Sequence, residues 1–237
     1  NEISKIKNNK IDKIVSKLNT DGYYFTNLKE FNINFDISKK IKSLDTVPGN
    51  KSKKKFFTNL YEFRKNDDLS TFAINKYFIK LISKYLKLSP IINNIQLIKS
   101  DIINDKQFYS SMNWHIDNHH DKLIKIMLLP FDLDIQGGPT CFLDKKTSEY
   151  IIKKNFYFKS PRYFSDSEIK EIKSNFKKKI KSFTGKKNDI LLIDTSKCLH
   201  MGSRCNAERY QLFVTYTPIQ TNDLNTLKSL KKFEFLN

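Results

Sequence analysis

The period of the hydrophobic pattern changes at Pro90, and this change limits the possible folds of the 237-residue chain more than any other feature. Before Pro90, apolar residues recur at helical spacing, and Asp21-Gly22 is a typical helix end. The pattern therefore predicts a mainly helical layer over residues 1 to about 90. The expected elements are a first helix up to Asp21, a short strand at 23–25, and helices near 37–44 and from about 70 to 86.

After Pro90 the chain breaks into short β-rich runs with turns at Gly137-Gly138-Pro139 and Gly185-Lys186. Ser165, with Glu168 three residues later, predicts the start of one helical insert between the strands. With no internal repeat or linker, we expect a single domain over 1–237, with a jelly-roll core at about 91–220 and a C-terminal tail at 221–237. The expected strand runs are IINNIQLIKSDII, QFYSSMNWHID, LIKIMLLPF, TCFL, ILLID and RYQLFVTYTP.

All four histidines of the chain occur in two short segments, around His115 and around His200. In a strand, residues i and i+2 project to the same face, so His115 and Asp117 can converge on one ion while Trp114 and Ile116 face away. With His200 they would provide the two imidazoles and one carboxylate of a facial triad for Fe(II). The alternative is a buried, hydrogen-bonded pair without metal.

A zinc hydrolase is a further alternative, because His115 and His119 would share a face if this stretch were helical. Asn118 and Asp121 favour a loop instead, and no Glu base adjoins His115.

The order of these motifs resembles that of Fe(II)/2-oxoglutarate-dependent oxygenases, in particular the phytanoyl-CoA dioxygenase-like group. This resemblance implies a double-stranded β-helix, the cupin-like jelly-roll, with Fe(II), 2-oxoglutarate and O₂ as cofactor and co-substrates. It implies hydroxylation of a C–H bond in a small metabolite or biosynthetic intermediate, with release of succinate and CO₂. The resemblance covers about Thr20 to Pro218 and includes NTDGYYFTNL, WHID, GGPTCFLDKKTSEY, PRYFSDSEIKEI, GKKNDILLIDTSKCLH and RYQLFVTYTP.

By this resemblance, Arg209 would form the salt bridge to the distal carboxylate of 2-oxoglutarate, which suits a planar guanidinium. Arg209 opens an alternating strand pattern, whereas Arg204 lies in a GSRCN turn, so Arg204 is the weaker alternative. Asp117 favours hydroxylation over halogenation, since the halogenases of the superfamily lack this carboxylate.

Other polar residues near the motifs are candidates for the same cavity. Asn113 precedes His115 by two positions, so its amide would hold the co-substrate or a metal-bound water. The alternative is that Asn113 is an ordinary residue at the edge of a strand. Lys125 would assist with a carboxylate if it points inward, although exposed Lys is commoner. His119 and His120 would contact substrate at the mouth of the site or be solvated. Cys198 is expected to be a buried, inert thiol.

The net charge of +18, from 43 basic and 25 acidic residues, permits an anionic substrate. Because the Lys residues are dispersed among abundant Asn and Ile, AT-rich codon usage is the favoured explanation of the charge. The denser patches are Lys51–Lys55 beside a Pro48-Gly49 turn, and Lys177–Lys179 on an expected helix. Two functional alternatives remain, a nucleic-acid demethylase of the same superfamily and a catalytically silent metal-binding module.

The composition also indicates where in the cell the protein is expected and the redox state of its cysteines. No apolar run of about 18 residues and no signal-like N-terminus occur, so the expected location is the cytoplasm, without a membrane span. Cys141, Cys198 and Cys205 form no C-x-x-C pair, which predicts reduced thiols. The sequence does not define the oligomeric state.

Overall fold

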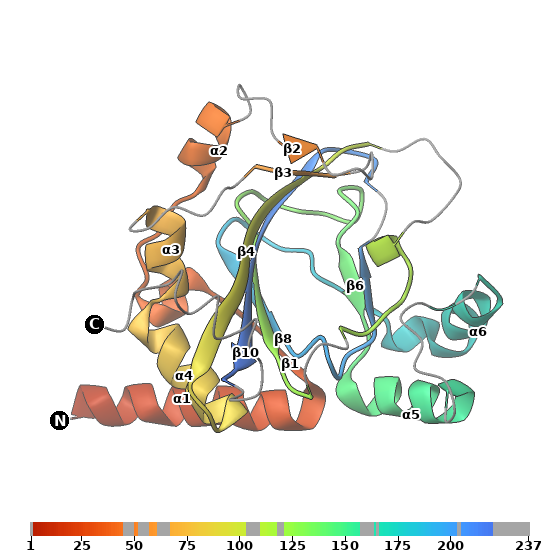
Figure 1. The fold of residues 1–237 in the computed structure, drawn as a ribbon, viewed down its shortest axis with the longest axis horizontal. Coiled ribbons are helices and arrows are strands. Elements are labelled where there is room, and N and C mark those ends of the chain that lie inside the picture. The colour runs from red at the N-terminus through yellow and green to blue at the C-terminus, as the bar shows by residue number, and fades with distance from the viewer. Residues whose placement is uncertain are drawn as a thin grey trace.

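The computed structural model describes residues 2–44, 50–51, 57–60, 67–102, 110–117, 121–156, 164, 166–202 and 205–219. Their strands form two antiparallel sheets that face each other, with helices outside both (Figure 1). The strands are β1 (Tyr23–Asn27), β2 (Asn50–Lys51), β3 (Phe57–Asn59), β4 (Pro90–Ser100), β5 (Ile124–Leu128), β6 (Thr140–Phe142), β7 (Lys181–Ser182), β8 (Asp189–Ile193), β9 (His200–Gly202) and β10 (Arg209–Pro218).

Within the described residues, the larger sheet has the order β1-β8-β5-β10-β4-β3-β2 and the smaller sheet has the order β7-β6-β9. Sequence-distant strands are neighbours in both, as in a jelly-roll. The pairing aligns Arg209 at the start of β10 with Ser100 at the end of β4. This register brings the side chains of Arg209 and Ser100 close to each other.

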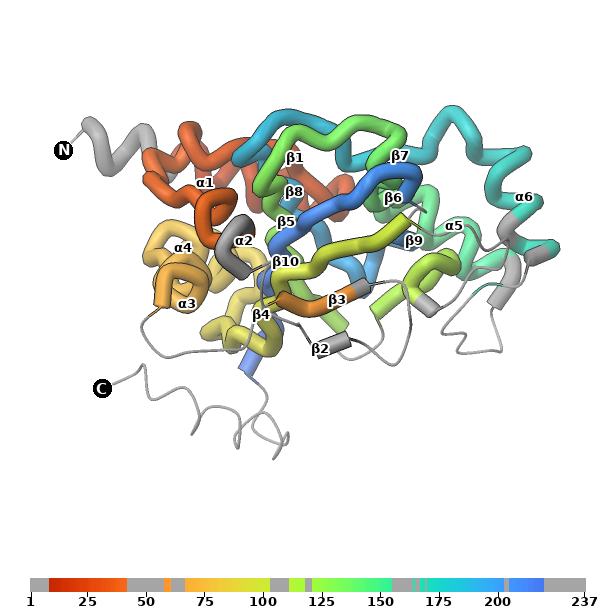
Figure 2. Tube along the Cα trace, turned by 90° about the horizontal axis from the view of Figure 1, so that it is seen from above, coloured from red at the N-terminus to blue at the C-terminus, as the bar shows by residue number. Residues whose placement is uncertain are grey.

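The N-terminal helices cover the outer face of the larger sheet, as the helical spacing predicted (Figure 2). Ile14 and Leu18 of α1 and Leu81 of α4 are fully buried in one cluster with Ile126 and Leu212 of the sheet. This apolar burial is what holds the layer to the sheet. The elements of the layer are α1 (Glu2–Asp21), the 3₁₀ helix η1 (Leu28–Phe31), α2 (Ser38–Leu44), α3 (Asp68–Ala73) and α4 (Lys76–Leu86).

The prediction of one helix from about 70 to 86 was wrong. The structure has α3 and α4 instead, because Asn75 leaves the helical conformation and its side chain accepts a hydrogen bond from the Tyr77 amide at 2.9 Å. Asn at such a position offers the backbone an alternative to the helical hydrogen bond and starts a new helix.

A second helical layer covers the smaller sheet and consists of α5 (Lys145–Phe156), α6 (Asp166–Phe176) and the 3₁₀ helix η3 (Lys177–Lys179). Ile151 and Ile172 from these helices pack with Trp114 and Leu199. The insert helix after Ser165 was predicted, but α5 was not. A signal for α5 was present, since the Asp144 carboxylate caps it by accepting from the Thr147 amide at 2.8 Å.

The prediction of a strand along 107–117 was also wrong for the part that the structure describes. Ser110–Met112 is a 3₁₀ helix, η2, and His115 forms an isolated β-bridge with His200. The local consequence of the prediction holds nevertheless, because Trp114 and Ile116 pack together in the cluster beneath α5 and α6.

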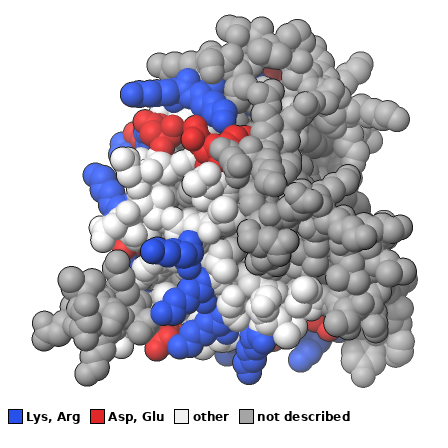
Figure 3. Space-filling view, turned by 60° about the vertical axis from the view of Figure 1, so that its left-hand side comes forward, with Lys and Arg blue, Asp and Glu red and all other residues white. Residues whose placement is uncertain are grey.

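Basic side chains occur at several places on the face formed by the N-terminal helices. On the described part of this face, some of them adjoin one another in the lower part of the view, and others lie beside acidic groups or are separated by uncharged surface (Figure 3). Ion pairs here join Lys10 to Glu30 and Lys84 to Asp12. Pro48-Gly49 and Lys53–Lys55 lie outside the described residues, and Lys177–Lys179 form an exposed 3₁₀ turn.

Among the helices of the described segments, none is long and apolar enough to cross a membrane.

Candidate metal centre and adjoining cavity

Two segments far apart in the sequence meet at the centre of the site. His115 and His200 exchange backbone hydrogen bonds of 3.0 Å in both directions, and their rings lie 4.2 Å apart between centroids. Two residues further on, the Asp117 amide donates to the Thr195 carbonyl at 3.0 Å. These contacts bring the side chains of His115 and Asp117 together with that of His200.

Both imidazole rings are held in one tautomer by the backbone. His115 Nδ1 donates to the Asn113 carbonyl at 2.8 Å, and His200 Nδ1 donates to the Cys198 carbonyl at 3.0 Å. Because a carbonyl can only accept, the proton lies on Nδ1 and Nε2 keeps its lone pair. This arrangement orients Nε2 of both rings as a metal ligand.

The third member, Asp117, lies between the two Nε2 atoms. Its Oδ1 is 3.9 Å from His115 Nε2 and its Oδ2 is 3.8 Å from His200 Nε2. One donor atom from each of these three residues fits within 4.8 Å of the others. Two imidazoles and one carboxylate at this separation form the facial donor set that suits non-haem Fe(II).

The protonation states also suit a metal site. Burial lowers the pKa of His115 and of His200, so both rings are neutral at neutral pH. Burial alone would raise the pKa of Asp117, but the Lys125 ammonium and the hydrogen bonds from Lys125 and Thr195 outweigh it and keep that pKa below its ordinary value. Metal ligands must be deprotonated, and these three are.

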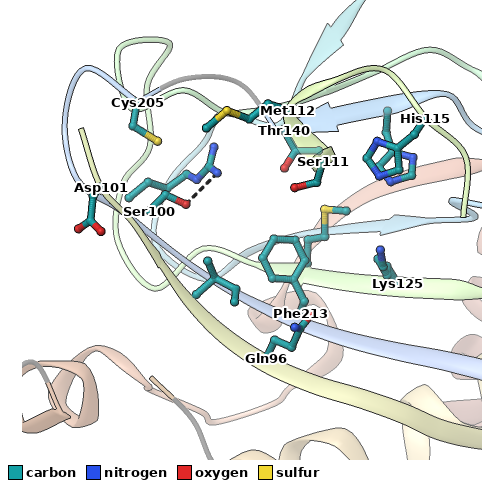
Figure 4. A pocket seen from close by; sticks show the side chains of 15 residues that line it. Gln96, Ser100, Asp101, Ser111, Met112, His115, Lys125, Thr140, Cys205 and Phe213 are labelled. Carbon is teal, nitrogen blue, oxygen red and sulfur yellow. Dashed lines mark hydrogen bonds between the residues drawn. The ribbon is translucent and has the colours of Figure 1, made fainter. Parts of the chain in front are cut away.

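A cavity of about 170 Å³ extends from the two histidines between the sheets. Figure 4 shows His115 and Lys125 at one end, and Ser100, Asp101 and Cys205 at the other. Apolar side chains lie between the two ends. The wall of the cavity is therefore apolar and its two ends are polar. Its lining residues are Gln96, Ile98, Ser100, Asp101, Ser111, Met112, His115, Lys125, Met127, Thr140, His200, Gly202, Cys205, Arg209 and Phe213.

Arg209 lines this cavity with a buried guanidinium that is only partly satisfied. Its Nη2 donates to Ser100 Oγ at 3.1 Å, while Nε and Nη1 have no hydrogen-bond partner in the described part of the molecule. Burial lowers the pKa of Arg209, although an arginine remains charged at neutral pH. Leaving such donors unpaired is costly, so the site fits an anionic ligand with two acceptor oxygens.

The other candidate residues have different positions. Lys125 points inward, and its Nζ donates to Asp117 Oδ2 at 2.6 Å. Asn113 contributes its carbonyl to His115, and its side chain is not part of the cavity lining. Cys198 is fully buried in the core between the sheets. His119, His120 and Arg204 lie outside the described residues.

Several site residues were missed in the sequence. Thr195 donates its hydroxyl to Asp117, Ser100 contacts Arg209, and Phe213 and Thr140 line the cavity. The alternation of β10 was a signal for Phe213, because it shares a face with Arg209. Ser100 and Thr195 had no local signal, since the role of Ser100 depends on strand pairing and that of Thr195 on a contact between distant segments.

Comparison with known proteins finds similarity in structure only. No family model matches the chain, and no curated protein matches its sequence. The similar solved structures include EctD from S. alaskensis with 2-oxoglutarate and 5-hydroxyectoine, at 15% identity and a TM-score of 0.59, covering 86% of this chain and 75% of that chain.

Two further structures are the epimerase SnoN with Fe3+, alpha ketoglutarate and nogalamycin RO, and HygX from Streptomyces hygroscopicus with nickel, 2-oxoglutarate and hygromycin B. SnoN has 8% identity and a TM-score of 0.57, with 88% of this chain and 83% of that chain covered. HygX has 10% identity and a TM-score of 0.54, with 87% and 86% covered. This similarity confirms the predicted jelly-roll fold.

Proposed function

We propose that this protein is an Fe(II)- and 2-oxoglutarate-dependent oxygenase that hydroxylates a C–H bond of a small molecule. The observation that carries the proposal is the presence, in one cavity of a jelly-roll, of a His-Asp-His donor set at one end and a buried, unsatisfied arginine at the other. The similar solved structures that contain iron or nickel together with 2-oxoglutarate or alpha ketoglutarate support the same assignment.

In this proposal His115, Asp117 and His200 hold the metal, and Arg209 pairs with the distal carboxylate of 2-oxoglutarate. Fe(II) with 2-oxoglutarate and O₂ supplies an oxidant for unactivated C–H bonds, with succinate and CO₂ as co-products. The chain's own residues orient the ligands and exclude water. The carbonyls of Asn113 and Cys198 fix the imidazoles, as described above.

Two assignments within the site are part of the proposal. Arg209, rather than Arg204, is the carboxylate anchor because it lines the cavity and two of its buried nitrogens have no partner among the described residues. Lys125 assists with a carboxylate, and its bond to Asp117 supports a place beside the metal. Asn113 as a co-substrate ligand, and His119 and His120 as substrate contacts, remain sequence predictions.

The reaction type is the finer part of the proposal. Hydroxylation is preferred because Asp117 occupies the position that a halogenase would leave without a carboxylate. SnoN is an epimerase, so an epimerised product is the specific alternative. Mass spectrometry of product distinguishes the two, since hydroxylation adds one oxygen atom and epimerisation leaves the mass unchanged.

A small-molecule substrate agrees with the ligands of the similar structures, nogalamycin RO, hygromycin B and 5-hydroxyectoine. A nucleic-acid demethylase is the second candidate, which the charge of +18 favours. Binding to mixed oligonucleotides that disappears at moderate salt would exclude it. Retained sequence-independent binding at 0.2 M salt, with demethylation of a methylated oligonucleotide, would replace the small-molecule proposal.

The deciding experiment is anaerobic addition of Fe(II) and then 2-oxoglutarate, followed by visible absorption. We expect the weak charge-transfer band of the iron-chelated keto acid. Arg209→Ala should weaken the binding that produces it, while Arg209→Lys should retain part of it. His200→Ala should abolish it, and the exposed control Lys186→Ala should behave as wild type.

Iron binding without the band would exclude the 2-oxoglutarate assignment. A normal band without succinate release on exposure to O₂, for every substrate tried, would favour the catalytically silent module. Uncoupled succinate release in wild type but not in His200→Ala would support the oxygenase.

A further inference from the structure

We propose that Thr195 is a positioning residue that fixes the Asp117 carboxylate for metal binding, an inference that rests on the metal site of the proposed function. Thr195 belongs neither to the donor set nor to the cavity lining. It acts through Asp117, to which it is connected at two points.

The two contacts hold both the backbone and the side chain of Asp117. The Thr195 carbonyl accepts from the Asp117 amide at 3.0 Å, and Thr195 Oγ1 donates to Asp117 Oδ2 at 2.5 Å. The Lys125 ammonium donates to the same oxygen at 2.6 Å. In the described part of the chain no hydrogen bond reaches Oδ1, which faces His115 Nε2.

Two donors on Oδ2 restrict rotation of the carboxylate about its terminal torsion. That torsion is otherwise broad, so an unrestrained aspartate samples many orientations. A hydrogen bond to an ionised acceptor is also about twice as strong as a neutral one. The Thr195 hydroxyl therefore favours the orientation in which the carboxylate points at the two imidazoles.

Thr195 is itself held rigidly in a turn after β8. The Asp194 carbonyl accepts from the Cys198 amide at 2.9 Å, and its carboxylate accepts from the Ser196 amide at 2.9 Å. On the other side, the Tyr85 hydroxyl of α4 donates to the Asp194 carboxylate at 2.6 Å. Thr195 is fully buried, so its hydroxyl has few alternative partners.

The expected consequence is a loss of metal affinity when the hydroxyl is removed. Groups that orient a metal ligand typically contribute about 10- to 100-fold in metal affinity. Thr195→Val removes the donor and keeps the branched shape, so packing is conserved. Thr195→Ser restores the donor.

The test is titration of the metal-free protein with Mn(II) alone, followed by electron paramagnetic resonance, with no 2-oxoglutarate present. We expect Thr195→Val to bind Mn(II) about 10- to 100-fold more weakly than wild type and Thr195→Ser to bind close to wild type. The matched control is Thr217→Val, because Thr217 is also buried and its hydroxyl has no partner in the described structure. This control should bind as wild type.

Circular dichroism checks that each variant is folded, and Thr195→Ala replaces Thr195→Val if the latter does not fold. Wild-type Mn(II) affinity in a folded Thr195→Val or Thr195→Ala would overturn the inference and leave the proposed function intact. Absence of Mn(II) binding in the wild type would overturn both. Mn(II) binding that depends on Thr195, without a 2-oxoglutarate band on Fe(II), would support Thr195 and exclude the co-substrate.

Discussion

Alternation along β10 divides its side chains between the site and the core. Arg209 and Phe213 face the cavity, whereas Leu212, Val214 and Tyr216 pack beneath the N-terminal helices. This period of two is a backbone property, so the strand carries a cavity-lining residue and a core residue at neighbouring positions.

We expect Arg209→Met to stabilise the protein in the absence of 2-oxoglutarate. The guanidinium is buried with two unpaired nitrogens, and Met removes this desolvated charge while keeping a similar length. The expected gain is about 1 to 4 kcal/mol in the free energy of unfolding. Urea denaturation of both proteins measures it. A destabilised Arg209→Met would show that Arg209 has a structural role in the free protein.

At the scale of elements, α4 supports the turn that holds Thr195. Asp194 is fully buried, and burial raises the pKa of its carboxyl. Tyr85 and Ser196 donate to the Asp194 carboxylate and partly compensate for this burial. The contact joins the N-terminal helical layer to the turn that contacts Asp117.

Tyr85→Phe should destabilise the fold by about 1 to 3 kcal/mol, because it removes one donor from a buried carboxylate. Thermal unfolding at neutral pH tests this. Tyr85→Phe made in an Asp194→Asn background is the control, because that background lacks the buried carboxylate. An equal loss in both backgrounds would attribute the effect to helix packing rather than to Asp194.

A second contact between elements is an ion pair whose contribution to stability depends on pH. Lys187 Nζ lies 2.8 Å from Asp36 Oδ2, and Asp36 Oδ1 accepts from the Ser38 amide at the start of α2. The Lys187 hydrogen bond is the largest of the interactions that lower the pKa of Asp36 to about 2. The folded-state pKa lies below the unfolded value, so this stabilisation is present above about pH 4 and is lost as pH falls through about 2.

Asp36→Asn should therefore reduce the stability difference between pH 5 and pH 2. The effect should be less than about 1 kcal/mol, because both side chains are more than one third exposed and solvent screens the pair. Urea denaturation at the two pH values measures the difference. An unchanged pH dependence would show that the ion pair does not persist in solution.

At the scale of the whole molecule, the proposed ligands would connect the two sheets. His200 belongs to the smaller sheet and Arg209 to the larger one. Bound metal with 2-oxoglutarate should therefore stabilise the fold by mass action, by about 2.7 kcal/mol at 100 times the Kd.

Anaerobic thermal unfolding with Mn(II) and 2-oxoglutarate should show this as a raised Tm, and a chelator should reverse it. In Arg209→Ala the increment from 2-oxoglutarate should be lost while the increment from Mn(II) remains. An equal increment from 2-oxoglutarate in wild type and Arg209→Ala would place the co-substrate away from Arg209.

Local patterns in the sequence sufficed for the helical layer, most strands of the jelly-roll and the convergence of His115, Asp117 and His200. These follow from hydrophobic period and the side-chain directions of extended backbone. The break at Asn75 has a local cause, the side-chain cap of α4, which the helical period does not reveal. Tertiary structure alone decided the contacts of Ser100 and Thr195. The physical reason is that these features depend on which distant strand or turn supplies the hydrogen-bond partner, and no local period encodes that pairing.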